Sequence, residues 1–498
     1  MRKPAASFCA SSVQNCTNPP TFAPKHLLPD IIKLFFFFVV LTICTVYVQN
    51  DPFFWDTVQL GSKHAHFFFE NGLRWAPLPV EIDSGHPPVF GYFLAVIWTV
   101  FGKSLPAGHW AMLPFLFGIA WLLFRLGQRY GGPKWGWWLL PLVFLDPVMA
   151  GQSTLVGPDI VLVFCFLLTV EGALSRAPGW VVLGVLGLCA ISTRGMMTAA
   201  ALFVWQMLAS WRPEKFFKPV RNGWLAFLPG FGFAVWFLSW HQNQAGWIGF
   251  HAGSPWAAAF QLVGLAGFFK NILVLGWRWL DAGRIVEWGV LAYLVWATEG
   301  AARKKLIAQN SFTALALLFL CLLFFLTPSA LIYQNLSAHR YFLPLFLGFH
   351  LLVLHLVATT DIPMAKKRVL AAFLVLGLTS GNLWIYPRGI SMDWDATLAY
   401  LPYHGLRAAM LRHLDERQID YTTVGSTFPN VNTGENLLLN GDQRQFAEKD
   451  FSRNAYIFTS NIFNDFSKPE YEILEREWVL EKKIGRAGVW VALFRRQK

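Results

Sequence analysis

The sequence predicts a polytopic α-helical membrane protein with a small extracytoplasmic α/β domain at its C-terminus. Of the 498 residues, 55% are hydrophobic and only 14% are charged, and the mean hydropathy is +0.42. Long apolar runs recur between residues 31 and 386, as expected of membrane-spanning helices, while the alternating pattern of a membrane barrel does not occur. Residues 387–498 are more polar, and their YTTVGS and VWVALF segments are typical of strands.

The N-terminal residues 1–30 predict a cytosolic tail. They are too long and too polar before the first apolar run to resemble a cleaved signal peptide, and Lys25 and Lys33 flank that run. The six cysteines lie in this tail or in predicted spans, and no CxxC pair occurs. Neither a disulfide framework nor a cysteine zinc site is therefore indicated.

The net charge of +12 is explained by membrane topology rather than by nucleic-acid binding. The basic residues fall in short loops between apolar segments, as the positive-inside rule expects, and form no continuous stripe. Four basic clusters mark cytosolic loops: Arg125, Arg129 and Lys134; Arg212, Lys215, Lys218 and Arg221; Arg303, Lys304 and Lys305; and Lys366, Lys367 and Arg368.

Placing these four clusters in the cytosol requires about eleven spans. We expect them near 31–49, 109–126, 138–154, 160–175, 179–194, 197–211, 224–240, 285–301, 312–330, 341–359 and 369–386. Counting the short apolar segment 87–102 as a span would invert the downstream charge pattern, so we place it at or in the outer face. The transmembrane domain is thus 31–386, with an outer loop at 50–108. In another outer loop, 241–284, the amphipathic piece GWRWLDAGRIVEW is expected to lie along the interface.

Polar groups gather on the outer side in this topology. The first outer loop alone carries five carboxylates among aromatic residues and histidines: Asp51, Asp56, Glu70, Glu81 and Asp83. Acids beside amphipathic helices at a membrane face suggest chemistry on a substrate that lies partly in lipid. The alternative is a polar loop with incidental acids.

Six stretches in this order carry a family resemblance. They are PFFWDTVQLGSKHA (52–65), DSGHPPVFGYFLAVIWTVFG (83–102), LFRLGQRYGGPKWGWW (123–138), GQSTLVGPDIVLVFCFLLT (151–169), STRG (192–195) and SAHRYFLP (337–344). The set resembles the GT-C glycosyltransferases, specifically the protein-mannosyltransferase and aminoarabinose-transferase branch, over roughly residues 30–360. That family usually has an acid pair near the first position. This chain has Trp55-Asp56-Thr57 there, so Asp51 or Asp83 could supply a second acid.

The resemblance implies an inverting transfer of a sugar from a polyprenyl-phosphate carrier, similar to dolichyl-phosphate-mannose, to a protein, lipid or glycan acceptor. It places the enzyme in a bacterial inner membrane with its active site on the extracytoplasmic side. The sequence contains no Gly-rich phosphate loop and no Walker lysine, which favours a lipid-linked donor over a nucleotide sugar.

Such a transfer needs a carboxylate base, and Asp56 is the first candidate. Phe53, Phe54 and Trp55 could exclude water from it and raise its basicity. Helix capping is the alternative role for Asp56 and also for Asp159, which follows a proline at the start of an apolar run. Asp83 could position the acceptor or only solubilise its loop.

The leaving phosphate needs cations, and arginines provide paired hydrogen bonds to phosphate oxygens. Arg340, followed by Tyr341, starts a span on the outer side, where snorkelling to the interface is the alternative role. Arg194 lies near the end of an apolar run, where an unpaired cation is costly. Lys63 is a third candidate.

The remaining candidates are outer histidines and one acid within a span. His86 and His251 are candidate substrate ligands. A divalent metal held by outer histidines and carboxylates is left open, although no HExxH motif occurs. Asp146, within a predicted span, is either functional or an acid satisfied by neighbouring helices at a proline kink.

Two other classes of protein compete with the enzyme reading. A transporter or flippase for a glycolipid would also be polytopic, but the chain lacks visible internal symmetry and its polar groups cluster at one face. A membrane scaffold that presents the C-terminal domain would not explain the outer acids and arginines. Within the enzyme reading, we expect residues 387–498 to shape acceptor access.

Overall fold

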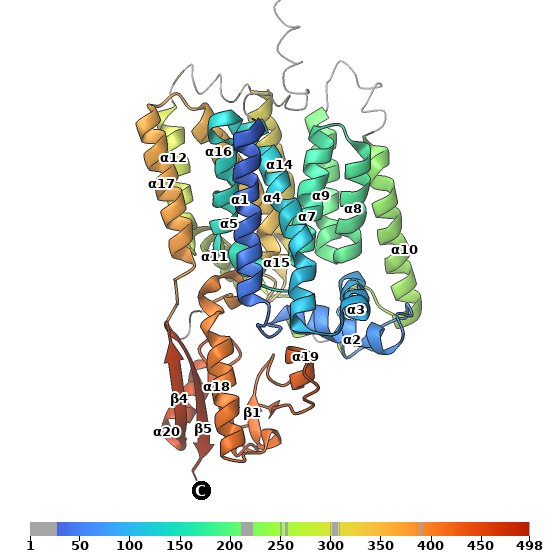
Figure 1. Cartoon of the computed structure of the whole chain (residues 1–498), viewed down its shortest axis with the longest axis vertical. Helices are drawn as coiled ribbons and strands as arrows, with labels where there is room; N and C mark the ends of the chain where they lie inside the picture. Colours follow the sequence, from blue (N-terminus) through green and yellow to red (C-terminus); the bar gives the residue numbers. More distant parts are fainter. Residues whose placement is uncertain are drawn as a thin grey trace, which may run out of the picture.

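The computed structural model describes residues 27–497 apart from 211–222, 250, 254–256, 299, 301–306, 308, 388–389 and 391. A bundle of long helices stands above a smaller α/β domain (Figure 1). Nearly all of the predicted cytosolic tail, and the predicted inner loops around Arg212 and Arg303, lie outside the described residues.

A helix lies within each of the eleven predicted spans. In chain order these are α1 (Leu27–Val48), α4 (Leu105–Trp135), α5 (Leu139–Leu145) with α6 (Pro147–Ser153), α7 (Pro158–Leu174), α8 (Pro178–Ile191), α9 (Thr193–Ser210), α10 (Leu228–Ala245), α12 (Arg284–Ala297), α14 (Asn310–Leu326) with α15 (Pro328–Ile332), α16 (Leu343–Thr359) and α17 (Met364–Gly381).

By length and composition, four helical segments of the described chain could cross a membrane, or five if the bent pair α6 and α7 is one span. Each predicted span therefore overlaps a helix, and the number of crossings stays a prediction.

The predicted span 138–154 is broken in the middle by Asp146. Its carboxylate accepts from the backbone N–H of Val148 at 2.9 Å, and Pro147 takes the first position of α6. This is a helix N-cap, and a proline there needs no hydrogen-bond partner for its nitrogen. Arg284 Nη2 also donates to Asp146 at 2.8 Å. Of the two alternatives for Asp146, the structure shows the acid held at a proline kink.

Two short helices lie across the outer end of the bundle. They are α2 (Lys63–Glu70) and α3 (Val89–Phe101), which pack closely together near the C-terminal domain (Figure 1). A Cβ at Gly91 would lie only 2.2 Å from the Cβ of His64, so this approach requires a glycine. The position of α3 fits the expectation that 87–102 lies at the outer face.

The amphipathic piece 276–288 is divided between two helices, and its placement along the interface stays a prediction. Helix α11 (Leu265–Leu280) ends inside it, and α12 begins at Arg284. The intervening residues Ala282 and Gly283 have φ values of 52° and 82°. A Cβ at Gly283 would lie 2.0 Å from the Gly377 carbonyl oxygen, so close packing against α17 fixes the turn.

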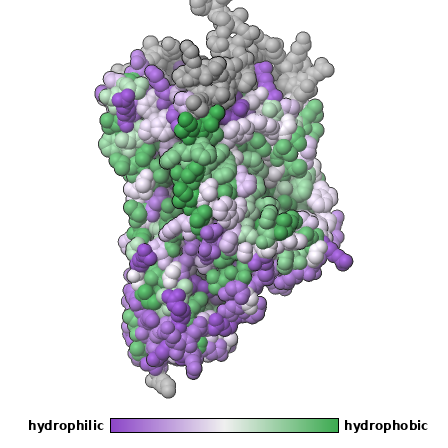
Figure 2. Space-filling view, viewed as in Figure 1, coloured by the Kyte–Doolittle hydropathy of each residue, from purple (hydrophilic) through white to green (hydrophobic). Residues whose placement is uncertain are grey.

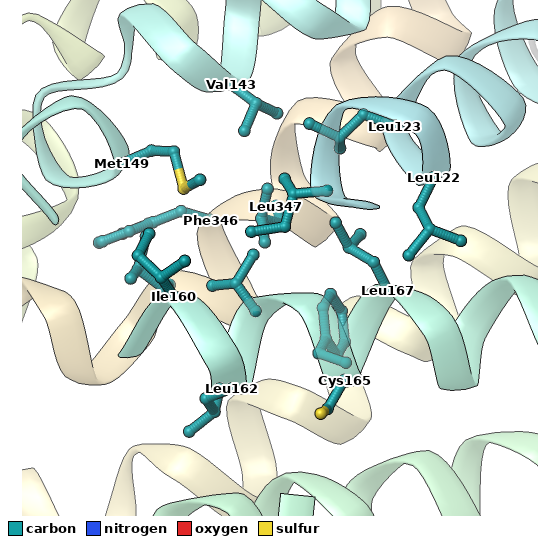
Figure 3. Close-up of a cluster of buried hydrophobic side chains, with 14 of the residues drawn as sticks. Leu122, Leu123, Val143, Met149, Ile160, Leu162, Cys165, Leu167, Phe346 and Leu347 are labelled. Atoms are coloured by element: carbon teal, nitrogen blue, oxygen red, sulfur yellow. The ribbon is translucent and has the colours of Figure 1, made fainter. Parts of the chain in front are cut away.

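The bundle is held together by aliphatic and aromatic side chains. Figure 3 shows a buried cluster in which α4, α5, α6, α7 and α16 meet. The cluster includes Leu122, Leu123, Val143, Met149, Ile160, Leu162, Cys165, Leu167, Phe346 and Leu347. Hydrophobic residues also cover much of the visible bundle surface, whereas hydrophilic residues dominate the C-terminal domain (Figure 2). This contrast fits a bundle solvated by lipid and a domain solvated by water.

The C-terminal domain contains a five-stranded sheet of order β2-β1-β3-β5-β4. The pairs of β1 (Val424–Ser426) with β2 (Ala447–Glu448) and with β3 (Tyr456–Ser460) are parallel. Strand β5 (Val489–Arg496) pairs antiparallel with β3 and with β4 (Trp478–Arg486). The helices are α18 (Pro402–Glu416), α19 (Gly434–Leu438) and α20 (Lys468–Glu477). Both strands predicted from the sequence are present, although only the VGS part of YTTVGS is extended.

The basic clusters test the predicted orientation. Arg125, Arg129 and Lys134 lie toward the end of α4, and 366–368 begin α17, at the end of the bundle away from the C-terminal domain (Figure 1). Within the described residues, these cations thus gather opposite the outer acids.

We predict that cysteines introduced at the two ends react differently with an impermeant thiol reagent. Ser452 and Lys134 are both exposed. Ser452→Cys should be labelled from outside sealed cells, and Lys134→Cys only after permeabilisation, with the parent protein as control. The opposite labelling pattern would invert the topology.

Candidate functional site

Asp56 stands in an unusual backbone setting just after α1. It precedes a buried π-helix, η3 (Thr57–Ser62), and follows Trp55, whose φ of 50° is left-handed. Such strained residues and π-turns concentrate at functional sites. The Asp56 side chain makes no capping hydrogen bond to η3. The capping role is therefore not the one that the structure shows.

Arg340 brings together acids from distant parts of the chain. It lies in a short 3-10 helix, η8 (His339–Phe342), and its side chain is 5% exposed. Its Nη2 donates to Asp56 Oδ2 at 2.5 Å, its Nη1 contacts Asp395, and its Nε lies 3.8 Å from Asp159 Oδ2. A buried arginine with these contacts is not snorkelling to the interface.

Arg194 supplies the second cation of the cluster. It lies in the first turn of α9, and its Nη1 donates to Asp159 Oδ1 at 2.8 Å. The two guanidiniums flank the Tyr341 ring, with their carbons 4.1 Å (Arg194) and 5.1 Å (Arg340) from its centroid. The carboxylate of Asp159 pairs with these arginines, which argues against a purely capping role.

This cluster contains one carboxylate more than it has guanidiniums, since Asp56, Asp159 and Asp395 face Arg194 and Arg340. Burial raises the pKa of Asp56, and the nearby Asp159 raises it further, against the lowering effect of Arg340 and Arg194. A carboxylate whose pKa is raised is a better proton acceptor than an ordinary surface acid.

Asp395 is the member of the cluster that the sequence analysis missed. It lies beyond the last predicted span, in the segment MDWDATLAY (392–400). This segment packs against α6, where Gln152 Nε2 donates to the Asp395 carbonyl oxygen at 2.8 Å. The sequence does offer a signal for Asp395, because it is an acidic residue within an aromatic stretch directly after the last predicted span.

The DSGHPP motif forms a turn beside the cluster. Asp83 Oδ1 accepts from the Gly85 N–H at 2.8 Å, and Asp83 Oδ2 accepts from His241 Nε2 at 2.8 Å. The φ of Gly85 is 70°, and a Cβ there would lie 2.1 Å from the Gly249 carbonyl oxygen. Asp83 is thus buried and holds the loop to α10. Whether it also contacts substrate stays a prediction.

His86, next in this motif, faces the cluster. Its Nδ1 lies 2.9 Å from the hydroxyl of Thr193, the residue before Arg194. Burial and the charge of Arg194 lower the pKa of His86 to about 3, so the ring is neutral at physiological pH. A neutral imidazole can orient a polar substrate group without adding charge to the site.

Two predicted site residues lie apart from the cluster. The ammonium group of Lys63 donates to Gln59 Oε1 at 2.9 Å, and the exposed His251 packs against Trp247 with ring centroids 5.7 Å apart. Neither contacts Asp56, Arg194 or Arg340 in the structure. Any role for them in substrate binding stays a prediction.

A pocket opens next to Asp159 and Arg194. Its other lining residues are mostly apolar and come from η3, α2, the DSGHPP loop, α3, α7 and the end of α8: Leu60, His64, His86, Pro87, Phe90, Pro158, Leu162, Ile191 and Ser192. A cation beside an apolar wall can bind the anionic headgroup of a lipid whose hydrocarbon tail lies among apolar side chains.

A second network of buried ion pairs holds His339, the residue before Arg340. His339 Nε2 lies 2.6 Å from Asp281 Oδ1, and His339 Nδ1 lies 2.6 Å from Asp393 Oδ2. Arg278 completes it, with Nη2 3.3 Å from Asp393 Oδ1. Because His339 adjoins Arg340, this network fixes the backbone that presents the guanidinium. The sequence analysis did not find these partners, which are 54 or more residues from His339.

Within the described ranges, no group of three or more His, Cys, Asp or Glu side chains is arranged to hold a metal ion. The outer histidines instead bond to protein groups, as His64 Nε2 does in donating to the Ile82 carbonyl oxygen at 2.8 Å. The metal site that the sequence leaves open is therefore not identified among the described residues.

Comparisons with known proteins give one similarity of fold. No protein-family model and no curated sequence matches the chain. Among solved structures, the chain is similar to the crystal structure of ArnT from Cupriavidus metallidurans bound to undecaprenyl phosphate. The identity is 13% and the TM-score 0.47, over 76% of this chain and 72% of ArnT.

We predict that Arg340 stabilises the fold more than Arg194 does. Arg340→Ala leaves both Asp56 and Asp395 buried without an arginine partner, whereas Arg194→Ala removes one contact from a less buried site. Removing one member of a buried pair costs roughly 3–5 kcal/mol.

The measurement is thermal unfolding of the protein in detergent. Arg340→Ala should lower the midpoint clearly more than Arg194→Ala, and Arg74→Ala, at an exposed outer-loop arginine, should leave it unchanged. Equal midpoints for all three variants would show that the cluster does not hold the fold.

Proposed function

We propose that this protein is a GT-C glycosyltransferase that moves a sugar from a polyprenyl-phosphate carrier to an acceptor at the outer face of the membrane. The observation that carries the proposal is the Asp56–Arg340–Asp159–Arg194 cluster, buried at the outer end of an apolar helical bundle. It combines a basic carboxylate with phosphate-binding cations beside an apolar wall.

Arg194 and Arg340 suit the carrier phosphate. Their guanidiniums can donate paired hydrogen bonds to phosphate oxygens, and these bonds strengthen as the leaving phosphate gains charge in the transition state. The adjacent pocket includes Leu60, Phe90 and Leu162, side chains that suit an isoprenoid chain. A donor bound in this way would place its anomeric carbon beside the carboxylates.

Asp56 suits the general base. In a single displacement, the acceptor hydroxyl attacks the anomeric carbon, its proton passes to a carboxylate, and the carrier phosphate leaves from the opposite face. The stereochemistry at that carbon is therefore inverted. The donor phosphate would compete with Asp56, Asp159 and Asp395 for the guanidiniums. Donor binding would therefore loosen the Arg340–Asp56 contact and leave Asp56 free to act as the base.

Asp56→Asn tests the base. The change keeps size and polarity but removes the basic oxygen, so transfer should fall roughly 10²–10⁴-fold while the protein still folds. The reaction is followed as sugar transfer from a radiolabelled polyprenyl-phosphate sugar to a membrane extract. Asp361→Asn, at an exposed residue near the opposite end of the bundle, is the matched control.

The pH dependence gives an independent check. A base is active above its pKa, and burial raises the pKa of Asp56 above its ordinary value of 3.8. Activity should therefore decline as the pH falls, beginning at a higher pH than an ordinary aspartate would give.

Asp56→Asn activity within threefold of the wild type would remove Asp56 from the mechanism.

Single substitutions at each of the two arginines test whether they bind the donor phosphate. Arg340→Ala and Arg194→Ala should each weaken use of the lipid donor, seen as a lower kcat/KM for that substrate. The lysine variants should recover only part of the loss, because an ammonium cannot make the paired contact. Normal donor kinetics in both alanine variants would leave Lys63 as the remaining candidate cation.

A further inference from the structure

Four of the described arginines are buried, and one of them differs from the others. Arg278, Arg284 and Arg340 each have a carboxylate oxygen within hydrogen-bonding distance. Arg407, on α18 of the C-terminal domain, is 6% exposed, yet no carboxylate of the described chain lies within ion-pairing distance of it. A buried cation without a counter-charge is costly to a fold.

The groups that do contact Arg407 are neutral. Its Nε donates to Asn430 Oδ1 at 2.6 Å, and the Tyr403 hydroxyl lies beside the guanidinium. Burial raises the pKa of Tyr403 to about 12, so this hydroxyl remains uncharged. Burial likewise lowers the pKa of Arg407, but a guanidinium remains protonated at physiological pH.

Arg407 lines a pocket between α18, the loop before α19 and the segment before β2. The other lining residues are Leu411, Tyr421, Asn430, Asn432, Gly434, Leu438, Asp442, Arg444, Gln445 and Phe446. The pocket and the open space at its mouth measure about 270 Å³. Because this figure includes open solvent, an incoming group would approach Arg407 from the mouth of the pocket.

The acid of the pocket does not neutralise Arg407 at contact distance. Asp442 is held instead by Arg444, whose Nε and Nη2 bond its two oxygens at 3.0 Å and 2.9 Å. Arg444 also reaches Asp415 at 2.7 Å on the other side. Arg407 is therefore the lining cation that remains available for an incoming anion.

The segments that supply the lining residues also contact the loop that carries Asp56. The Phe53 N–H donates to the Leu437 carbonyl oxygen of α19 at 2.8 Å, and the Trp55 ring meets Phe428 edge-on at 6.1 Å. Glu435 of α19 additionally binds His66 at 3.0 Å. The segments that form the pocket are thus joined to the loop of the proposed base through residues next to the lining residues in the chain.

We propose that the Arg407 pocket binds a phosphate or carboxylate group of the acceptor. This rests on the proposed function only in naming the acceptor. The guanidinium would make a charge-assisted contact with the anionic group, and the amides of Asn430 and Asn432 line the same space. The acceptor hydroxyl could then extend toward Asp56.

The first test is hydrogen–deuterium exchange of the full-length protein in detergent, with inorganic phosphate as probe. Phosphate should slow exchange in peptides covering 427–446 of the wild type. Arg407→Gln should abolish this protection, and Arg407→Lys, which keeps the charge, should retain a weakened form. Arg412→Gln, at an exposed arginine on the same helix, should behave as the wild type. No protection in the wild type, or equal protection in Arg407→Gln, would overturn the anion site.

The second test determines whether the anionic group bound at Arg407 belongs to the acceptor. With a cell-envelope extract as acceptor source, Arg407→Gln should raise the half-saturating amount of extract roughly tenfold or more at an unchanged maximal rate. An unchanged half-saturation, together with lost phosphate protection, would overturn the assignment to the acceptor. A wild-type protein that transfers no sugar yet shows phosphate protection would instead count against the proposed function alone.

Discussion

The structure depends on one buried guanidinium, that of Arg340, shared among carboxylates from three regions. Asp56 follows the first helix, Asp159 opens α7, and Asp395 follows the last helix of the bundle. A lone arginine in this position would be costly, and each lone acid would be as well. Their mutual contacts therefore fasten the outer loop, the bundle and the start of the C-terminal domain at one point.

The same arrangement explains how a polar reaction could take place beside lipid. Charges that already compensate one another can be buried before substrate arrives, and in the proposed reaction a phosphate would then replace a carboxylate at Arg340. Arg194 and Tyr341 hold the second guanidinium in place by an ion pair and a ring contact. The His339 network behind Arg340 keeps its backbone fixed while such an exchange occurs.

Much of the helical framework could be predicted from the sequence, because apolar runs and basic loops constrain it strongly. Asp56, Asp159, Arg194 and Arg340 could be found as acids and arginines at one face. Their pairing could not, since Asp56 and Arg340 are 284 residues apart. Asp395 was missed because it lies in a segment that sequence polarity assigns to the C-terminal domain.

The most direct test of the central claim is native mass spectrometry of the purified protein in mild detergent. We predict a co-purifying species with the mass of a polyprenyl phosphate or its sugar conjugate on the wild-type protein, strongly reduced on the Arg194→Ala/Arg340→Ala double variant. A protein that carries no such lipid under conditions in which it remains folded, or a double variant that retains it equally, would contradict the assignment of this cluster to the donor phosphate.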